Sequence, residues 1–383
     1  QVQNMKNTTA IIGGAGHIGL PLSCLISNQG VPTIIIDNNE VSIEKIQNKI
    51  SPFYEEGLNE DLEKAIDGGM QVTKDINEIS KCNIVIITLG TSSKITDIEN
   101  FNNLLQDVIT LSNDETMVIL RSTLSAGTME NIVKDCPEKK NLKFIYAPER
   151  IAEGKAVKEL REMPQIIGSQ NQEHYLLAES FFNSLGIKTL KMTYKEAEFL
   201  KLFLNTYRYL QFSTLNFFEN IAYKYHIDFK NVLELASKEY PRLEGVPDSG
   251  FVGGPCLIKD SKTFANSYPD ANGLVQNFLD VNDNYIHNII QKCKHTFSNK
   301  NIIQLGLTFK PNSDDIRDSQ ALRLYETLLD EGYNVKAFDP YIHDPNKWEE
   351  IKDFSENIII ATNHKEFESV TLSSKKVIII GKK

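Results

Sequence analysis

The sequence predicts an α/β protein in which two regions of strand–helix alternation are separated by a long helix. Short runs of β-branched residues alternate with amphipathic segments in the first half of the chain. The segment from Lys195 to about Tyr225 then contains neither Pro nor Gly, and strand-like runs return after Asn301. Repeated strand–helix–strand units indicate doubly wound, mostly parallel sheets.

The first region holds short runs that are apolar throughout, as buried strands of a parallel sheet are. We expect strands at Thr9–Ile12, Thr33–Ile36, Ile84–Thr88, Met117–Leu120, Phe144–Tyr146, Gln165–Gly168 and Lys188–Leu190, with amphipathic helices at Val41–Ile50 and Ile98–Leu111 among them. Together they predict a Rossmann-like dinucleotide-binding domain over residues 1–193.

A central helical domain is expected over residues 194–298. Its long helix is apolar on most faces, which predicts burial on several sides, between domains and at a subunit interface. A loop rich in Pro and Gly, Pro241 to Pro255, and a helix from Gly273 to about Phe297 follow.

A smaller Rossmann-like α/β domain is expected over residues 299–383. Its elements are a helix at Gln320–Glu331 and strands at Asn301–Leu305, Val335–Phe338, Asn357–Ala361 and Lys376–Ile380. Two such lobes predict a ligand in a cleft at the carboxyl ends of their strands.

Composition narrows the function. A net charge of −10 disfavours a nucleic-acid partner. No apolar run approaches membrane-spanning length and the chain start lacks a secretory layout, so a soluble, cytoplasmic protein is expected. The five cysteines, an odd number without a CxxC pair, predict reduced thiols and neither a disulfide scaffold nor a zinc site. The scattered histidines predict no metal site, and we expect His343 and His364 at the surface.

The clearest motif is a glycine-rich turn between the first strand and the first helix. Gly14, Gly16 and Gly19 form the pattern GxGxxG, which permits a tight turn, close approach of a pyrophosphate and close helix–strand packing. The helix N-terminus offers N–H groups and partial positive charge. Asp37 ends the second strand, where a carboxylate binds ribose hydroxyls, and no Arg follows for a 2′-phosphate. NAD is the predicted cofactor.

A second motif surrounds Cys256 in the sequence GFVGGPCLIKD, Gly250–Asp260. A cysteine after a Gly-Gly-Pro turn has an accessible sulfur, and the nearby Lys259 favours its thiolate, the reactive form. A dinucleotide fold with a loop cysteine suits aldehyde oxidation, in which a thiolate adds to the aldehyde and a thioester is later hydrolysed.

Two further pairs of polar residues are candidates for a part in this chemistry. Glu149 and Glu153 stand four apart just past a strand end, where carboxylates can activate water. Lys201 and Asn205 share a face of the long helix among apolar neighbours, so this pair needs a partner or a ligand.

In order and over nearly the whole chain, these segments resemble the UDP-glucose/GDP-mannose dehydrogenase family. The resemblance includes Gly14–Pro21 (GAGHIGLP), residues 122–128 (STLSAGT), Pro148–Gly154 (PERIAEG), the segment from Glu198 to Asn205, Gly250–Asp260 and Gly306–Ser319 (GLTFKPNSDDIRDS). It implies NAD-dependent oxidation of a nucleotide-sugar alcohol to a carboxylate, with two NAD consumed per sugar.

The resemblance also implies roles for individual residues. Cys256 would be the nucleophile, Lys201 and Asn205 would hold the reacting oxygen and a water, and Asp260 would assist deprotonation of the hydroxyl. Thr123 and Glu149 would position or activate the hydrolytic water. The implied cofactor-binding residues are Gly14, Gly16, His17, Ile18, Gly19, Asp37, Thr91, Thr123, Glu153 and Arg317. The implied substrate-binding residues are Glu149, Arg150, Lys201, Asn205, Arg242, Phe251, Gly253 and Lys310.

Within these roles, Lys310 and Arg317 would face nucleotide or cofactor phosphates, and Arg242 would reach the substrate of a neighbouring subunit. The resemblance therefore implies at least a homodimer joined through the long helix. His17 stands where the family often has an aromatic residue and could touch the pyrophosphate.

The sugar is indicated by Arg150, since enzymes acting on UDP-glucose usually carry Phe after the same Pro-Glu. The PER form resembles the branch acting on UDP-N-acetylhexosamines, and the following Ile-Ala-Glu-Gly favours N-acetylmannosamine. UDP-N-acetylglucosamine and UDP-glucose stay open as alternatives, and the acidic product suggests a route to a polysaccharide.

Two other classes of protein are less compatible with the sequence. A β-hydroxyacid dehydrogenase shares the dinucleotide domain and long helix, but it needs neither the Cys256 loop nor a third domain. A non-catalytic nucleotide-sugar sensor would not need to keep Cys256, Lys201, Asn205, Asp260 and Glu149 together.

Overall fold

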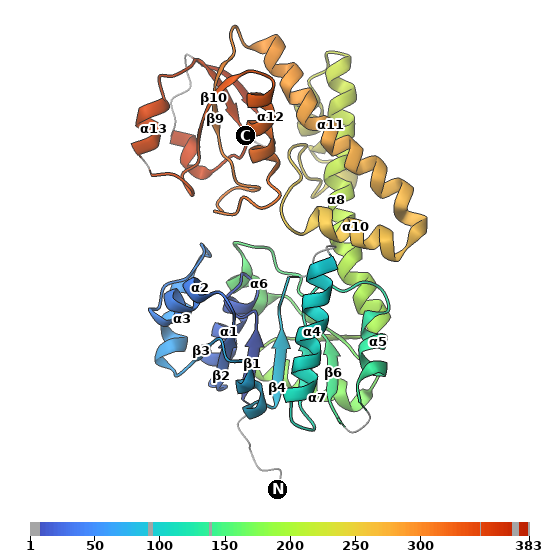
Figure 1. Cartoon of the computed structure of the whole chain (residues 1–383). Coiled ribbons are helices and arrows are strands. Elements are labelled where there is room, and N and C mark those ends of the chain that lie inside the picture. Colours follow the sequence, from blue (N-terminus) through green and yellow to red (C-terminus); the bar gives the residue numbers. More distant parts are fainter. Residues whose placement is uncertain (1–7, 91–94, 138–139, 345, 370–374, 382–383) are drawn as a thin grey trace. The chain divides into compact units, whose positions relative to one another are not determined.

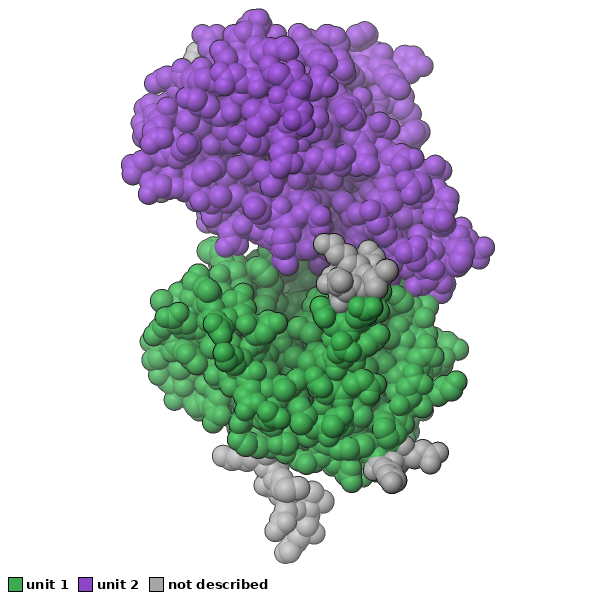
Figure 2. Space-filling view, in the orientation of Figure 1, with its two compact units in different colours: residues 1–202 green, residues 203–383 purple. Residues whose placement is uncertain are grey.

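The computed structural model describes residues 8–90, 95–137, 140–344, 346–369 and 375–381 (Figure 1). The chain forms two compact units, residues 1–202 and 203–383, coloured separately in Figure 2. The boundary falls within the long helix α8, Tyr194–Lys224. No helix in the described ranges combines the length and apolar character needed to cross a membrane.

Unit 1 is built on a single eight-stranded sheet in the order β3-β2-β1-β4-β5-β6-β7-β8. The strands are β1 Thr9–Ile12, β2 Thr33–Ile36, β3 Gln71–Thr73, β4 Ile84–Ile87, β5 Met117–Leu120, β6 Lys143–Tyr146, β7 Gln165–Gly168 and β8 Thr189–Met192. All seven strands predicted for this region are confirmed to within two residues at each end. The eighth, β3, is a short edge strand that was not predicted.

The sheet is not parallel throughout. Strand β7 pairs with β6 antiparallel, through Tyr146 and Gly168, whereas β8 pairs with β7 in parallel. The last two strands therefore run against the first six. The mostly parallel sheet that was expected is confirmed, and the apolar pattern could not reveal this reversal because it fixes where a buried strand lies but not its direction.

Helices cover both faces of the unit 1 sheet, and the apolar core of this unit divides into three clusters. They are α1 Gly19–Asn28, α2 Glu40–Gln47, α3 Leu58–Asp67, α4 Ile95–Leu111, α5 Thr128–Asp135, α6 Ala156–Glu162 and α7 Gln172–Ser184, with a 3₁₀ turn η1 at Ile76–Lys81. The strands β1, β2, β4 and β5 are buried at every position, which is the reason their sequences are apolar on both faces.

The long helix α8 starts in unit 1 and continues into unit 2. Its Glu198 is buried and accepts hydrogen bonds from the backbone N–H groups of Gly127 and Met129, at 2.7 Å each, at the start of α5. Farther along, large side chains of α8 stay exposed in the single chain, including Tyr207, Phe217 and Phe218 at 50%, 45% and 48%. The expected burial on several sides is thus not reached within one chain.

Unit 2 combines helices with a second, four-stranded sheet in the order β10-β9-β11-β12. Its strands are β9 Asn301–Leu305, β10 Asn334–Phe338, β11 Asn357–Ile360 and β12 Lys376–Ile379, all parallel. Its helices after α8 are α9 Phe229–Ser237, α10 Leu257–Ser267, α11 Asn272–Thr296, α12 Gln320–Asp330 and α13 Asn346–Ile351, with 3₁₀ turns η2 Pro241–Leu243, η3 Pro269–Ala271 and η4 Lys365–Ser369. The α/β class expected for both lobes is confirmed.

Candidate cofactor and catalytic sites

The glycine turn after β1 is shaped by steric necessity at two of its three motif positions. A Cβ on Gly14 would lie 2.8 Å from the Ile11 carbonyl oxygen, and one on Gly19 would lie 2.4 Å from the Gly13 carbonyl oxygen. A Cβ on Gly16 would meet nothing closer than 3.5 Å. The fold itself thus requires Gly14 and Gly19, whereas the bare backbone at Gly16 leaves space for a ligand.

The N-terminus of α1 and Asp37 complete a site that fits a dinucleotide. The first turn of α1 carries no acidic residue, and the side chain of its N-cap residue, Ile18, makes no capping hydrogen bond. No capping side chain therefore satisfies the N–H groups at the start of this helix, where an anion can bind. Asp37 is half-buried and accepts hydrogen bonds from the N–H groups of Ala15 and Asn39, each at 3.0 Å. Its carboxylate is therefore held beside the turn with capacity left for ribose hydroxyls.

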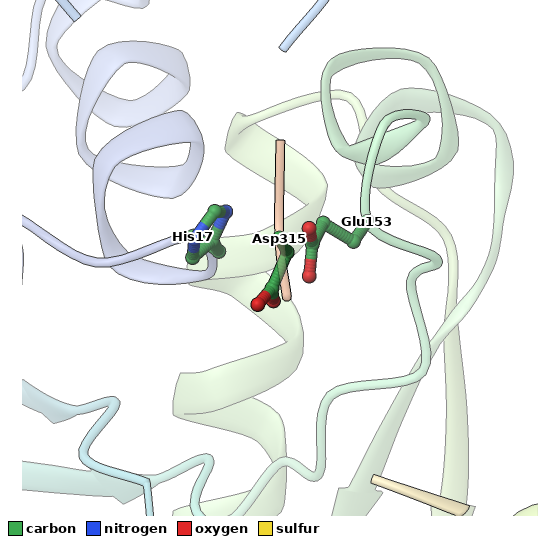
Figure 3. A group of neighbouring side chains, drawn as sticks. All are labelled: His17, Glu153 and Asp315. Carbon is green, nitrogen blue, oxygen red and sulfur yellow. The ribbon is translucent and has the colours of Figure 1, made fainter. Parts of the chain in front are cut away.

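His17 lies within this turn, and Glu153 lies on another loop of unit 1 (Figure 3). The His17 ring stacks on Phe53 at 4.0 Å between centroids, and both predicted residues are half-buried. Buried Glu55 accepts hydrogen bonds from the N–H groups of Gly154 and Ala156, at 2.7 and 2.8 Å. Glu55 thereby fixes the loop that bears Glu153. No motif in the sequence around Glu55 predicts this role. Thr91, also predicted at this site, lies outside the described residues.

Glu149 is held by a buried charge cluster at the ends of β5, β6 and β7. Arg121 is 1% exposed and donates to the Glu149 carboxylate and, at 2.8 Å, to the side chain of Gln165. The second Glu149 oxygen accepts from the N–H groups of Arg150 and Ile151. Burial, reinforced by the nearby Arg150 charge, lowers the pKa of Arg121 to about 9.

Two more predicted residues lie near this cluster. Thr123, half-buried, lies two residues after Arg121. Arg150 is half-buried and donates to the Pro164 carbonyl oxygen, so part of its guanidinium is engaged by the protein itself. Sequence reasoning did not identify Arg121, because an Arg after an apolar strand carries no signal of burial.

In unit 2, Cys256 is the cysteine that is open to solvent. It is exposed at the N-terminus of α10, whereas Cys24, Cys82 and Cys293 are buried and Cys136 is intermediate. Burial raises the pKa of Cys24 and Cys293 to about 12 and that of Cys82 to about 11. All five cysteines lie in the described ranges and none forms a disulfide.

Asp260, one turn into α10, is fully buried beside the predicted catalytic asparagine. The Asn205 side-chain N–H donates to the Asp260 carboxylate at 2.6 Å, and Lys259 lies 3.4 Å from its other oxygen. Lys201 stands one turn before Asn205 on α8 and is half-buried. The structure thus brings Asn205 and Asp260 together a single helical turn from Cys256.

The loop before Cys256 packs tightly against the segment between β9 and α12. A Cβ on Gly254, whose φ is +92°, would lie 2.6 Å from the Phe309 ring, and one on Gly253 would lie 2.7 Å from the Asp318 carbonyl oxygen. At the start of the loop, Asn216 of α8 pairs its side-chain amide with the N–H and C=O of Gly250, both at 2.8 Å. These contacts set the backbone that presents Cys256.

Of the remaining predicted binding residues, Lys310 and Arg317 belong to the segment between β9 and α12, and Phe251 and Arg242 lie elsewhere in unit 2. Lys310 lies over the Phe309 ring at 5.4 Å, and Arg317 forms a two-oxygen ion pair with Asp315 at 2.9 and 3.0 Å. Asp315, the third residue in Figure 3, belongs to unit 2. Phe251 packs edge-on against Tyr285. Arg242 is exposed on η2, and its guanidinium lies over the Tyr240 ring. Among the described residues, no hydrogen bond or ion pair joins Arg242 to another predicted site residue.

A Rossmann-type glycine turn with an acid after the second strand, and an exposed thiol close to a buried carboxylate–amide pair, are features expected of an NAD-dependent dehydrogenase. Three family models match the chain: the NAD binding domain of the UDP-glucose/GDP-mannose dehydrogenase family at residues 7–186, its central domain at 195–284 and its UDP binding domain at 303–383. The chain belongs to this family and is an NAD-dependent nucleotide-sugar dehydrogenase.

Individual relatives agree with the family assignment. The chain is 27% identical to a UDP-N-acetyl-D-mannosamine dehydrogenase of Methanocaldococcus jannaschii, over 93% of this chain and 86% of the relative. It is 28% identical to a putative UDP-glucose 6-dehydrogenase of Bacillus subtilis, over 85% and 80%. The structure of a UDP-D-ManNAc dehydrogenase from Pyrococcus horikoshii superposes with a TM-score of 0.88 at 26% identity, covering 98% of this chain and 95% of that one.

Proposed function

We propose that this enzyme oxidises the C6 alcohol of UDP-N-acetyl-D-mannosamine to the uronic acid in two steps, with Cys256 as covalent nucleophile. The observation that carries the proposal is the contrast among the thiols: Cys256 is exposed at a helix N-terminus, one turn from the Asn205–Asp260 pair, while the other cysteines are wholly or partly enclosed. A helix N-terminus favours the thiolate, which is the attacking form.

The first oxidation converts the alcohol to an aldehyde. Asp260, through water, accepts the hydroxyl proton, and Lys201 and Asn205 hold the reacting oxygen as negative charge develops on it. NAD, when bound, supplies the hydride acceptor for each of the two oxidations. The role of the glycine turn and Asp37 is to bind and orient it.

The second oxidation requires a covalent bond to sulfur. The Cys256 thiolate adds to the aldehyde carbon, giving a thiohemiacetal, and loss of a second hydride leaves a thioester. Water positioned by Thr123 and Glu149 then adds to the thioester carbonyl, and the C–S bond breaks to release the carboxylate and restore the thiol. Arg121 supports this role, since its guanidinium donates to the Glu149 carboxylate and holds its orientation.

The choice of sugar is supported by Arg150 and by the names of relatives. We propose that Arg150 and Phe251 contribute to the substrate site, with Gly253, Lys310 and a partner subunit's copy of Arg242 completing it. A relative named for UDP-glucose at the same level of identity keeps that substrate as the alternative to test.

The exposed aromatic side chains of α8 support a homodimer as the working assembly. Phe203 and Tyr207 stack on each other at 5.8 Å, and both are more than 40% exposed in the single chain. Apolar patches of this kind mark protein interfaces. The three-domain division, a cytoplasmic location and a role in polysaccharide biosynthesis belong to the same proposal.

The test is NADH formation at 340 nm with a limiting, known amount of UDP-N-acetylmannosamine, in parallel with UDP-N-acetylglucosamine and UDP-glucose. Two NADH per UDP-N-acetylmannosamine, abolished in Cys256→Ala, is the expected result. Activity confined to another sugar would overturn the substrate but keep the mechanism. One NADH per sugar, or full activity in Cys256→Ala, would overturn the covalent mechanism.

A further inference from the structure

His364 was expected at the surface, but it is fully buried in unit 2, just after β11. The ring lies between the two segments that follow β9 and β10. Its Nε2 is 3.0 Å from the Asp339 carboxylate and 3.1 Å from the Thr308 hydroxyl, and its Nδ1 is 3.1 Å from the backbone nitrogen of Asn312. The ring of Tyr341 packs against it at 4.9 Å. The surface expectation for His364 is therefore wrong.

These contacts define which ring nitrogen carries the proton. A backbone N–H can only donate, so Nδ1 of His364 accepts from Asn312 and is unprotonated. The proton is then on Nε2, where it donates to the Asp339 carboxylate. His364 is thus a neutral bridge between the acid after β10 and the loop after β9.

The loop that His364 holds is the segment between Gly306 and Ser319. Asn312 has a φ of +56°, a left-handed conformation that asparagine adopts more readily than most other non-glycine residues. Lys310 lies two residues before Asn312. Farther along, the same segment carries Arg317 and the Asp318 carbonyl, which accepts from the Gly254 N–H at 3.1 Å.

We propose that His364 is a positioning residue for nucleotide binding: by accepting the Asn312 N–H, it sets the loop conformation in which Lys310 meets the diphosphate of the UDP-sugar. This inference rests on the proposed function, which assigns Lys310 to the substrate. A point cation needs a defined position to bind a diphosphate well, because its attraction falls with distance. Lys310 is on an irregular loop, so that position depends on what holds the loop.

Two substitutions separate the two bonds of the His364 ring. In His364→Asn, the side-chain oxygen can take the place of Nδ1 and still accept from Asn312. In His364→Gln, the side-chain amide can take the place of Nε2 and still donate to Asp339, but the Asn312 N–H loses its acceptor. His343→Asn is the matched control, since His343 Nδ1 accepts from the Asp339 backbone N–H at 3.1 Å and does not touch the loop.

The experiment is calorimetric titration of UDP into the full-length wild type and the variants, with Lys310→Met alone and combined with His364→Gln. We expect His364→Gln to weaken UDP binding roughly tenfold and His364→Asn less than about threefold, with His343→Asn unchanged. Lys310→Met should weaken binding strongly in the wild type and add little in His364→Gln, since the two residues act through one contact. NAD binding, measured in the same samples, should be unaffected.

Three results would overturn the inference. The first is unchanged UDP affinity in folded His364→Gln. The second is fully additive losses in the double variant. The third, available even if His364→Gln does not fold, is a folded His364→Asn that binds UDP as weakly as Lys310→Met. Failure of the wild type to bind UDP at all would instead contradict the proposed function.

Discussion

Each of the two sheets of this enzyme has an aspartate directly after its second strand, but one aspartate is half-exposed and the other is fully buried. Asp37 and Asp339 each directly follow the second strand of their domain and accept hydrogen bonds from the turn after the first strand. Asp37 binds one N–H of that turn and stays half-exposed, whereas Asp339 is fully buried and binds Leu307, Thr308, Tyr341 and His364.

The connections to the first helix differ in parallel with the acids. In unit 1 only residues 13–18 separate β1 from α1, so the helix N-terminus lies directly at the turn. In unit 2 residues 306–319 separate β9 from α12. The first arrangement leaves an acid and a helix N-terminus for a ligand. In the second, the acid is buried and its carboxylate is bonded by groups of the protein itself.

The largest expected effect comes from the closed acid. Asp339→Asn should destabilise the protein by about 2–4 kcal/mol, because an amide cannot accept at both positions and the buried N–H groups lose their partner. Urea unfolding followed by far-UV circular dichroism measures the change. Asp37→Asn, the matched substitution in the open turn, should change the free energy of unfolding by less than about 0.5 kcal/mol. Equal losses of unfolding free energy in Asp339→Asn and Asp37→Asn would contradict the difference between the two acids.

A second contrast separates the glycines of the open turn. Gly19→Ala should cost about 1–3 kcal/mol of stability, since its Cβ has no space. Gly16→Ala should fold with near wild-type stability but bind NAD at least about tenfold more weakly. The added methyl group would keep the pyrophosphate of NAD from approaching the protein backbone at this position. Thermal melts and NAD titration separate the two outcomes. A Gly16→Ala variant with normal NAD affinity would show that the space at Gly16 is not used.

Among the thiols, the open and closed environments predict different rates of alkylation. Iodoacetamide at pH 8 should modify Cys256 first in the native enzyme, while Cys24, Cys82 and Cys293 should react only after unfolding, because burial raises their pKa and blocks access. Peptide mass spectrometry assigns the site, with Cys256→Ser as the control. Early modification of any of the three buried thiols would contradict this assignment.

The smallest effect concerns Glu219, a second closed acid in unit 2. Burial opposes its ionisation, but Lys292, with hydrogen bonds from Tyr285 and Ser249, outweighs burial and lowers the pKa of Glu219 below its usual value. A lowered pKa stabilises the fold fully above the unfolded value of about 4.3, and this stability is lost as pH falls through the folded pKa. Glu219→Gln should therefore be less stable than wild type at pH 7, with the gap closing below about pH 4. A gap independent of pH would contradict the charge assignment.

Much of the fold follows from local sequence patterns. Buried strands such as Thr33–Ile36 are recognisable because a parallel strand with helices on both faces is apolar throughout. Strand β3 escaped prediction because its three residues are exposed or half-buried and give no apolar run. The direction of β7 depends on the path of the chain through residues 147–164, which composition does not encode.

The candidate site divides in the same way. The positions of Gly14 in the turn after β1, of Asp37 after β2 and of Cys256 in an exposed loop were predictable, because each motif has a local physical reason. Arg121, Glu55 and His364 were not, because their partners are distant in sequence and charged or polar residues are normally expected at the surface.

The most direct test of the contrast between the two turns is the affinity of Asp37→Ala for NAD and for UDP, measured by calorimetry with a thermal melt of the same sample. The predicted result is NAD binding at least about tenfold weaker, about 1.4 kcal/mol, with UDP affinity and melting temperature unchanged. Unchanged NAD affinity, or a loss of stability comparable to that of Asp339→Asn, would show that Asp37 is a structural residue like its counterpart and contradict the account.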